Sequence, residues 1–416
     1  MKSCTHCQRL FDDDAGFCPI DGSALAPTAQ VAVAADPEDR RIGHLVCEGR
    51  YEIRRKVADG GMGRVYQAID RSTQTSVALK VLHQDVARDA VALERFKREY
   101  ALSAELPHHH IAEVRDFQKT EDDSYAIAME YLEGEELRMY LKREKKLAPA
   151  LVVRILSQLA IGLAQPHQLK LVHRDIKPDN VFLCHTDEGA IVKLLDFGSV
   201  RDNSEGAKKL TIIGTTIGSP FYMSPEQAQG LPGLDHRADV WSLAAIAYEC
   251  LTGTVPFGGS TGPQILLAIL GKEPDPPSTV DPSVPTTVDD VMSDALAKEA
   301  ATRIGTVGEL ADRFGAAYGL QGSHVDWAYL PEQRLKDVID QAMATLMMAG
   351  PSRPGMLDPD ATGPMVGQRL APGNAFHDED FVMGVPDSPP IALYIGAAIL
   401  ALLVIAAIVL LVIALV

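Results

Sequence analysis

The chain has little of what nucleic-acid-binding proteins and disulfide-rich secreted proteins depend on. Its net charge is −17 over 416 residues, so it has no basic excess with which to neutralise a phosphate backbone. It contains only six cysteines, too few for a dense disulfide framework. No apolar run follows Met1, so we expect no secretory signal. These shortages exclude a general nucleic-acid binder and a disulfide-stapled module, and they favour a cytoplasmic body of two to three domains.

The stretch that is most specific for chemistry reads HRDIKPDN. Within it, Asp175 can accept a proton from an incoming hydroxyl, Lys177 can neutralise charge on a phosphate in flight, and Asn180 can hold a metal ion. Asp196 follows sixteen residues later as a second, acidic metal ligand, and Lys80 lies far upstream after an apolar run. A hydroxyl acceptor, two metal ligands and two lysines are the parts that in-line phosphoryl transfer requires.

This ordered set of motifs resembles the eukaryotic-like (Hanks-type) protein kinases, and more narrowly their bacterial serine/threonine branch. The resemblance covers residues 51–316. It implies an α+β fold with two lobes, a small β-rich lobe and a large helical lobe, and it implies ATP and Mg²⁺ as cofactors. It further implies that Asn180 and Asp196 hold the Mg²⁺ and that proteins are the substrates. A lysine two residues after Asp175 is typical of members that act on Ser and Thr.

The resemblance also assigns roles within the small lobe. Lys80 is expected to bind the α- and β-phosphates and to pair with Glu99, on a helix predicted over residues 88–105. Without the resemblance, Glu99 reads as a surface partner of Arg95. In the glycine-rich loop, Ala58 replaces the first glycine of the family pattern, and we expect the loop to cover the nucleotide with weaker affinity. The nucleotide-binding residues are predicted to be Val57, Ala58, Gly60, Gly61, Gly63, Val65, Lys80, Met129, Glu130 and Leu132. The predicted catalytic residues are Asp175, Lys177, Lys80 and Glu99.

Further motifs belong to the predicted large lobe. Asp239 is expected to begin a central helix and to fix the backbone of the catalytic loop, and Glu226 is expected to pair with Arg303. Arg174, beside the catalytic aspartate, is expected to bind a phosphate on Thr211 or Thr215 that is introduced between neighbouring copies of the chain. The alternative is that these threonines are ordinary loop residues.

The N-terminal segment carries a possible zinc site. Cys4 and Cys7 form a Cys-x-x-Cys pair, and Cys18 and Asp21 follow in a Cys-Pro-x-Asp-Gly turn. Zn²⁺ accepts sulfur, nitrogen and oxygen ligands in a tetrahedral site, and a segment this short cannot build a core without a metal. We therefore predict a zinc-ribbon-like knuckle with Asp21 as the fourth ligand, or His6 in its place. A redox pair and a segment that binds no metal are the alternatives.

The predicted domain organisation follows from these motifs and from composition. We expect a zinc-ribbon-like knuckle over residues 1–25, a linker over 26–46 and the kinase domain over 47–316. Residues 317–390 are expected to hold a short helix and then an acidic, Pro- and Gly-rich tether without fixed structure. The helix is predicted from about Leu330 to Met348, with Leu335, Val338 and Ile339 on one face.

Residues 391–416 form the one long uncharged apolar run. A hydrocarbon core of about 30 Å needs roughly 20 such residues in a helix, so we predict a single transmembrane span rather than a buried core helix. Because ATP is cytoplasmic, we expect the N-terminal body on the cytoplasmic side of the inner membrane and the chain to be anchored by its tail. The predicted function is phosphorylation of protein Ser and Thr hydroxyls by a membrane-tethered kinase that phosphorylates itself. The alternative is a pseudokinase or scaffold that binds partners through the zinc knuckle and the helix that follows the kinase domain.

Overall fold

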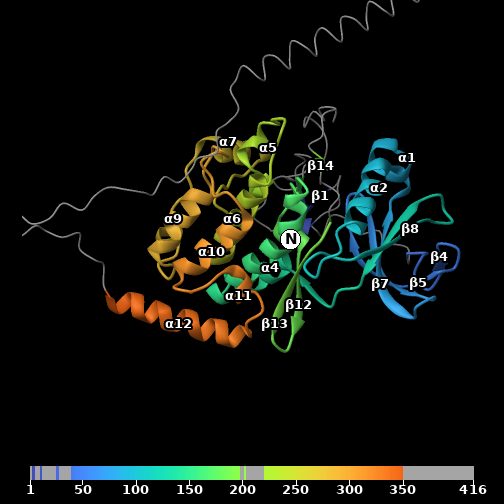
Figure 1. Ribbon diagram of the computed structural model, residues 1–416. Helices are drawn as coiled ribbons and strands as arrows, with labels where there is room; N and C mark the ends of the chain where they lie inside the picture. Colours follow the sequence, from blue (N-terminus) through green and yellow to red (C-terminus); the bar gives the residue numbers. More distant parts are fainter. Residues whose placement is uncertain are drawn as a thin grey trace, which may run out of the picture. The chain divides into compact units, whose positions relative to one another are not determined.

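The structure, a computed structural model, describes residues 39–196 and 220–349 and four short strands outside these ranges (Figure 1). The strands are β1 (Lys2–Cys4), β2 (Leu10–Phe11), β3 (Leu25–Pro27), β4 (Leu45–Val46), β5 (Tyr51–Asp59), β6 (Gly63–Asp70), β7 (Thr75–Leu82), β8 (Val114–Lys119), β9 (Tyr125–Glu130), β10 (Gly134–Glu136), β11 (Leu171–Val172), β12 (Val181–Thr186), β13 (Gly189–Leu194) and β14 (Arg201–Asp202). The α-helices are α1 (Gln84–Arg88), α2 (Ala90–Ala104), α3 (Leu137–Glu144), α4 (Pro149–Gln168), α5 (Pro225–Ala228), α6 (Arg237–Thr252), α7 (Gly262–Gly271), α8 (Pro277–Val280), α9 (Thr286–Ala295), α10 (Val307–Ala317), α11 (His324–Trp327) and α12 (Glu332–Ala349). The described ranges also contain the 3₁₀ turns η2 (Pro178–Asn180) and η3 (Pro220–Tyr222).

The small lobe is a six-stranded antiparallel sheet in the order β4-β5-β6-β7-β9-β8. Strand β7 alternates: Val77, Leu79 and Val81 are buried in one core, and Lys80 lies between them on the opposite face. Successive side chains of a strand point to opposite faces of its sheet, so this pattern turns Lys80 toward helix α2. The apolar run that precedes Lys80 in the sequence thus forms a strand that presents this lysine on the face opposite the core.

Helix α2 packs on the sheet and supplies the partner of this lysine. The helix begins at the cap Asp89, whose side chain accepts hydrogen bonds from the amides of Val91 and Ala92. Phe96 is fully buried, and Glu99, one turn later on the same face, is buried as well. Val91, in the first turn of the helix, is 57% exposed.

The large lobe is built around two buried helices. Helix α4 begins at Pro149, a favourable first residue of a helix, and buries most of its side chains against α6, α10 and β13. Helix α6 is buried along nearly its whole length and ends at Gly253, whose left-handed backbone (φ 74°) favours glycine. The predicted α+β architecture, with a small β-rich lobe and a large helical lobe, is therefore confirmed.

Of the helices in the described ranges, only α4 is long and apolar enough to cross a membrane, and 78% of its most apolar window is buried inside the protein. It is therefore a core helix. The span predicted at residues 391–416 lies outside the described residues, as does the tether before it.

The boundaries of the kinase body differ from those predicted. Residues 39–46, assigned to the linker, pack against the small lobe, where Asp39 accepts hydrogen bonds from the hydroxyl of Tyr66 at 2.6 Å and from Arg64 at 3.1 Å. This segment has no periodic pattern, and its polar anchors lie far along the chain, so composition alone did not reveal it. At the other end, α10 runs to Ala317, one residue past the predicted end of the domain.

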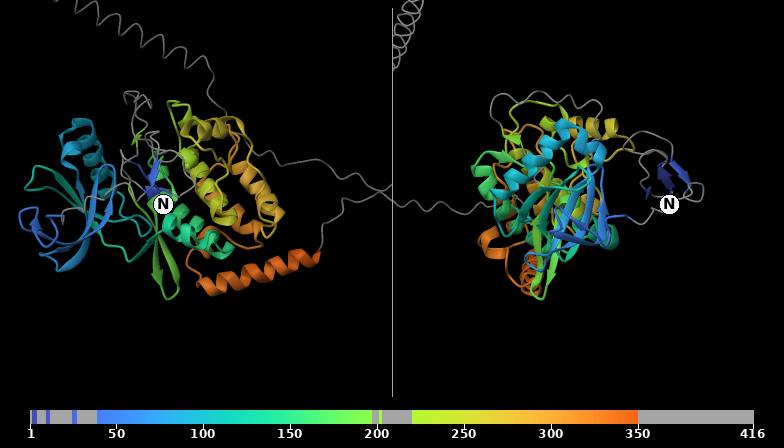
Figure 2. Two further views of the ribbon diagram at one scale, coloured as in Figure 1. Left: turned by 180° about the vertical axis from the view of Figure 1, so that it is seen from behind. Right: turned by 90° about the vertical axis from the view of Figure 1, so that its right-hand side faces the viewer.

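The chain after α10 also belongs to the body. Helices α11 and α12 both contact α4, so the single helix expected here is one of two (Figure 2). Leu335 and Ile339 are buried as expected. Val338 is 39% exposed, because it lies at the edge of the helix face that packs against the body.

The N-terminal strands form a separate three-stranded antiparallel sheet in the order β2-β1-β3. Cys4, the last residue of β1, is paired with Leu25, the first residue of β3. The register therefore brings the point where the chain leaves β1 and the point where it enters β3 to the same end of the sheet. The side chains of Cys4, Cys7, Cys18, Asp21 and His6 lie outside what the structure describes.

Candidate active site

The pairing between strand β7 and helix α2 carries the first part of the site. Lys80 Nζ lies 2.7 Å from Glu99 Oε1 and 3.0 Å from Asp196 Oδ2, so one ammonium is held between two carboxylates. Burial opposes the charge on Lys80, but the facing carboxylates outweigh it and hold the pKa of Lys80 above its ordinary value. Burial raises the pKa of Glu99, and the Lys80 ammonium works against that rise. The predicted lysine–glutamate pair is thus present in the geometry.

The β12–β13 hairpin explains why two residues sixteen positions apart meet. In its register Val181 faces Leu194, so Asn180, immediately before β12, lies across from Leu195, immediately after β13. The amide of Leu195 donates to the carbonyl of Asn180 at 2.8 Å, and Asp196 is the next residue. Asp196 has a left-handed backbone (φ 57°), an uncommon conformation for a residue with a side chain that has to be supported by its surroundings.

The catalytic loop gathers three of the predicted residues. Lys177 Nζ donates to Asp175 Oδ2 at 2.8 Å, and the side-chain amide of Asn180 donates to the carbonyl of Asp175 at 2.7 Å and to its Oδ2 at 3.2 Å. Asp175 keeps an exposed carboxylate, with 42% of its side chain accessible, so a hydroxyl from solvent can reach it. The arrangement can orient a hydroxyl, accept its proton and place a cation beside it.

Asp239 fixes the backbone of that loop, in the place the sequence predicted. Its fully buried carboxylate accepts hydrogen bonds from the amides of His173 and Arg174, both at 2.9 Å, and from His167 Nε2 at 2.8 Å. Burial alone would raise the pKa of Asp239, but these donors outweigh burial and hold the pKa below its ordinary value. The same bonds support the left-handed backbone of Arg174 (φ 68°), immediately before Asp175.

The donor atoms fit a magnesium ion. Mg²⁺ prefers oxygen ligands and keeps several waters, so one or two protein oxygens beside phosphate are enough. Asn180 and Asp196 supply an amide oxygen and a carboxylate on neighbouring ends of one hairpin, and the Asp196 side chain is 41% exposed. In residues 39–196 and 220–349, this site included, no group of three His, Cys, Asp or Glu side chains is placed to hold a metal ion, so Asn180 and Asp196 would need phosphate oxygens and water as further ligands.

The glycine-rich loop is the turn between β5 and β6. Ala58 pairs with Val65 across the hairpin, and the amide of Gly60 donates to the carbonyl of Gly63 at 3.0 Å. Val57 and Gly61 lie exposed on the same hairpin. Ala58 stands directly after a register shift between Lys56 and Ala58, and its backbone is not left-handed, so an alanine fits there without strain.

Gly63 is required by the close approach of β7. A Cβ atom at this position would lie 2.3 Å from the carbonyl oxygen of Val81, whereas one at Gly61 would meet nothing within 4 Å. We expect Gly63→Ala to lower the free energy of unfolding by about 1–3 kcal/mol, because the two strands would have to separate. Gly61→Ala, the matched control, should change it by less than about 0.5 kcal/mol. Urea unfolding of both variants tests this, and equal midpoints would contradict the steric argument.

Met129 and Glu130, which the sequence predicts to bind the nucleotide, are the last residues of β9, and Leu132 follows two residues later. Met129 and Leu132 are partly buried, and Glu130 holds the two lobes together rather than pointing into solvent. Its carboxylate accepts from Lys193 Nζ at 2.6 Å and from the amide of Glu113 at 2.8 Å. The sequence analysis gives Glu130 only as a nucleotide-binding residue, so the role of its side chain was missed.

The expected ion pair in the large lobe is present. The fully buried guanidinium of Arg303 donates to both oxygens of Glu226, at 2.8 and 3.0 Å. Ser224 caps the helix that carries Glu226, and Gln227 of the same turn donates to the carbonyl of Arg174 at 2.7 Å. The end of this segment is therefore tied directly to the catalytic loop. Phe197, Gly198, Thr211 and Thr215 lie outside the described residues.

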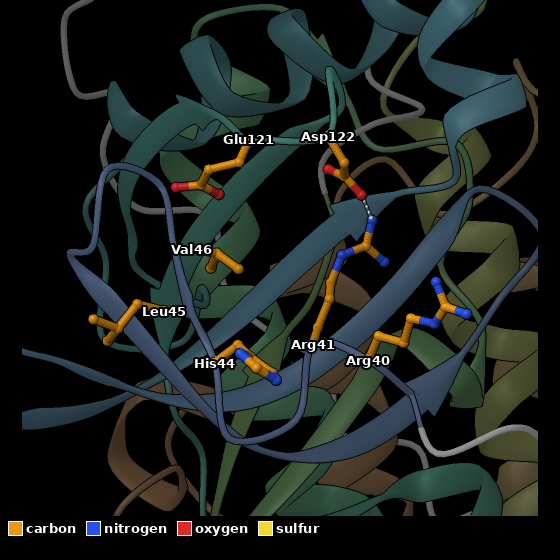
Figure 3. A pocket seen from close by; sticks show the side chains of 7 residues that line it. All are labelled: Arg40, Arg41, His44, Leu45, Val46, Glu121 and Asp122. Atoms are coloured by element: carbon orange, nitrogen blue, oxygen red, sulfur yellow. Dashed lines mark hydrogen bonds and ion pairs between the residues drawn. The ribbon is translucent and has the colours of Figure 1, made fainter.

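A hollow of about 180 Å³ lies on the small lobe, away from these residues (Figure 3). It is lined by Arg40, Arg41, His44, Leu45, Val46, Glu121 and Asp122. Figure 3 shows the Arg41 guanidinium on the Asp122 carboxylate, so one pair of opposite charges closes one side of the hollow. The hollow lies where residues 39–46 contact the turn between β8 and β9.

A family model described as the protein kinase domain matches residues 51–314. The chain is 36% identical over 270 residues to the serine/threonine-protein kinase pkn3 of Myxococcus xanthus, covering 64% of this chain and 49% of that protein. It is 36% identical over 263 residues to the serine/threonine-protein kinase PrkC of Bacillus subtilis, covering 63% of this chain and 39% of that protein.

Solved structures agree with the sequence comparison. A crystal structure of a mutant kinase domain of PknI from Mycobacterium tuberculosis matches with a TM-score of 0.52 and 29% identity. The match covers 66% of this chain and 97% of that one. The chain spans less than half the length of the two curated relatives above, so the likeness is confined to the two-lobed body.

Proposed function

The chain belongs to the protein kinase domain family, and from that premise we propose that it transfers the γ-phosphate of ATP to Ser and Thr hydroxyls of proteins. The observation that carries the proposal is the convergence of Lys80, Glu99 and Asp196 in one charge cluster, with Asp175 and Lys177 on the adjoining loop. Serine/threonine-protein kinases are among the relatives with 36% identity, which supports the choice of acceptor.

The reaction follows from the roles that these side chains can fill. Asp175 orients the substrate hydroxyl and takes its proton as the oxygen forms a bond to the γ-phosphorus, while the bond from that phosphorus to the bridging oxygen of ADP breaks. Lys177 places a cation beside the transferred group, and Lys80, held by Glu99, places one beside the α- and β-phosphates. Asn180 and Asp196 would hold the Mg²⁺, which neutralises phosphate charge when bound. Val57, Val65 and Met129 would enclose the nucleotide base, with hinge hydrogen bonds at Glu130 and Leu132.

The rival proposal, a pseudokinase scaffold, was motivated by Ala58. It is the weaker one, because the backbone at position 58 is not left-handed and so does not require glycine, and the charged residues needed for transfer all stand together. A phosphoproteome comparison between cells with the native chain and cells with Asp175→Asn discriminates the two. Loss of a set of phosphorylated Ser and Thr sites supports the kinase, and an unchanged set supports the scaffold.

We also propose that copies of the chain phosphorylate one another on Thr211 or Thr215. Arg174 lies directly before Asp175, where a guanidinium can receive a phosphate from a neighbouring segment. Attachment to one membrane would raise the local concentration of copies. Mass spectrometry of the active protein should find phosphate on one of these threonines, and absence of phosphate in a fully active preparation argues against the proposal.

For the N-terminal segment we propose a structural zinc knuckle. Support comes from the strand register, which brings the exit from β1, at Cys4, and the entry to β3, at Leu25, to one end of the sheet. Cys7 follows the first of these points and Asp21 precedes the second, so two halves of a ligand set can meet there.

Cys18→Ser is expected to release about one Zn²⁺ per chain, because it removes one of three thiolates from a four-ligand site. Metal analysis of the purified native chain and of the variant measures this. Kinase activity should remain, since the knuckle supplies no group to the transfer reaction. A native chain that contains no zinc would remove the site.

We further propose that residues 391–416 anchor the protein in the inner membrane, with the kinase body on the cytoplasmic side. The support is the length and composition of this run, which is uncharged throughout. The orientation of the protein in the membrane is inferred from its cofactor: ATP is cytoplasmic, so the kinase body should lie on the same side.

Truncation after Pro390 is expected to move the protein from the membrane fraction to the soluble fraction, because it removes the whole apolar run. Fractionation of cells that express either form, with detection of both by immunoblot, measures this. Recovery of the full chain in the soluble fraction, at the same proportion as the truncated form, would contradict the anchor.

A further inference from the structure

Residues that follow the segment matched by the protein kinase family model help to hold the strand that leads to Asp196 in place. Strand β13 ends at Leu194, two residues before this predicted metal ligand. His110, in the connection between α2 and β8, forms two hydrogen bonds with the end of this strand. Its carbonyl accepts from the amide of Leu194 at 2.9 Å, and its Nδ1 faces the carbonyl oxygen of Val192 at 2.8 Å.

The partners of His110 determine which of its nitrogens carries the proton. A carbonyl oxygen can only accept, so Nδ1 of His110 is the donor to Val192. Burial lowers the pKa of His110 to about 4, so the ring is neutral at physiological pH and its Nε2 is an acceptor. The hydroxyl of Tyr329 lies 2.6 Å from that Nε2 and therefore donates to it. The Tyr329 ring also stacks on the imidazole, with centroids 5.5 Å apart and an interplanar angle of 25°.

The segment around Tyr329 is itself held from helix α4. Gln158, fully buried, donates to the carbonyl of Ala328 at 2.7 Å and accepts from the amide of Val192 at 2.7 Å. Arg154, also buried, donates to the carbonyls of Leu330 and Ala190. Each of these α4 side chains thus ties β13 and residues 328–330 together.

We propose that Tyr329 is a positioning residue for Asp196, acting through His110 and the last residues of β13. It donates to His110, His110 fixes Val192 and Leu194, and the strand end sets the left-handed backbone of Asp196. Such a backbone persists only where its surroundings hold it, so a looser strand end would let Asp196 leave the geometry needed to bind metal. The inference rests on the proposed function, because it takes Asp196 as a metal ligand.

The experiment uses the full chain with Tyr329→Phe and Tyr329→Ala. Tyr329 is 52% exposed, so neither change leaves a large hole in the core. Tyr318→Phe is the matched control: its hydroxyl is buried at the end of α10 and makes no hydrogen bond within the described part of the chain. The first readout is the Mg²⁺ concentration that gives half-maximal binding of fluorescent ADP, and the second is the same concentration for phosphoryl transfer. The third is hydrogen exchange at the amides of Leu194 and Leu195 in the metal-free protein.

We expect Tyr329→Phe to raise the half-maximal Mg²⁺ concentration about fivefold, the scale of one lost hydrogen bond, and Tyr329→Ala to raise it further. Exchange at Leu194 and Leu195 should quicken in the same order, and Tyr318→Phe should change none of the three. Unchanged exchange, or faster exchange without a shift in Mg²⁺ dependence, would overturn the proposal. A native chain that binds ADP·Mg²⁺ but transfers no phosphate would instead refute the proposed function, while the exchange and binding readouts still decide the role of Tyr329.

Discussion

Asp175→Asn is expected to lower the rate of phosphoryl transfer by about 10³-fold while the affinity for ATP and Mg²⁺ stays near that of the native protein. An amide keeps the size of the carboxylate and can still accept hydrogen bonds from Lys177 and Asn180, which both contact this side chain. It cannot take a proton from the substrate hydroxyl. Transfer from γ-labelled ATP to a basic protein substrate, measured beside nucleotide binding, separates the two effects.

The control for this variant is Asp187→Asn. Asp187 lies exposed in the turn between β12 and β13, the hairpin whose other end carries Asn180 and Asp196. Asp187→Asn therefore removes one negative charge, as Asp175→Asn does, but at the far end of this hairpin. Its transfer rate should equal that of the native chain. Comparable rates for Asp175→Asn and the native protein would show that Asp175 is not the group that accepts the proton.

Lys80→Met is expected to impair both activity and stability, because the Lys80 ammonium contacts the carboxylates of both Glu99 and Asp196. Methionine fills a similar volume but leaves the buried Glu99 carboxylate, whose side chain is 6% exposed, without its partner. Removing one member of a buried ion pair costs about 3–5 kcal/mol of folding free energy. Transfer should fall together with nucleotide affinity, since the cation beside the phosphates is lost. Thermal unfolding and nucleotide titration measure the two effects.

The stability deficit of Lys80→Met should depend on pH. Burial raises the pKa of Glu99 and Lys80 opposes the rise, so the pKa of Glu99 is higher still in the variant. A carboxyl with a raised folded-state pKa is destabilising above its unfolded pKa near 4.5, and this cost disappears once the pH is low enough to protonate it in both states. The variant's deficit should therefore shrink as the pH falls from 8 toward 5.

Lys97→Met on the same helix serves as the control. Lys97 pairs with Glu94 on the surface, where both side chains are largely exposed, and such a pair contributes little. Its unfolding temperature should show no comparable deficit and no such pH dependence. A deficit of equal size in both variants would place the effect in α2 as a whole rather than in the buried pair.

Much of the site could be predicted because each motif is attached to a regular element with a fixed geometry. Strand alternation turns Lys80 toward α2, and a hairpin register brings Asn180 to Asp196. Asp239 was assigned to the catalytic-loop backbone from its place in the motif order, and its carboxylate accepts the two amides there. In these cases the contacts follow from spacing along one element or from the register between two neighbouring strands.

The rest of the body depends on contacts that no local pattern encodes. Asp39 sits in a stretch of Ala, Pro and Asp without periodicity, yet its carboxylate is buried against Tyr66, 27 residues away. Tyr329 contacts His110, which lies 219 residues earlier in the chain. The helix just before Tyr329, α11, has only four residues, too few to show a periodic pattern. Both contacts are fixed by tertiary packing, so the predicted linker extended too far along the chain and wrongly included 39–46, and the predicted tail missed the segment that supports β13.

The central claim is that this chain moves phosphate from ATP to Ser and Thr hydroxyls, and phosphoamino-acid analysis tests it most directly. The native chain is incubated with γ-labelled ATP, Mg²⁺ and a basic protein substrate, in parallel with Asp175→Asn. The label should appear as phosphoserine and phosphothreonine with the native chain, and it should be absent or reduced about 10³-fold with the variant. Native protein that binds ATP and Mg²⁺ yet labels neither itself nor the substrate would contradict the claim.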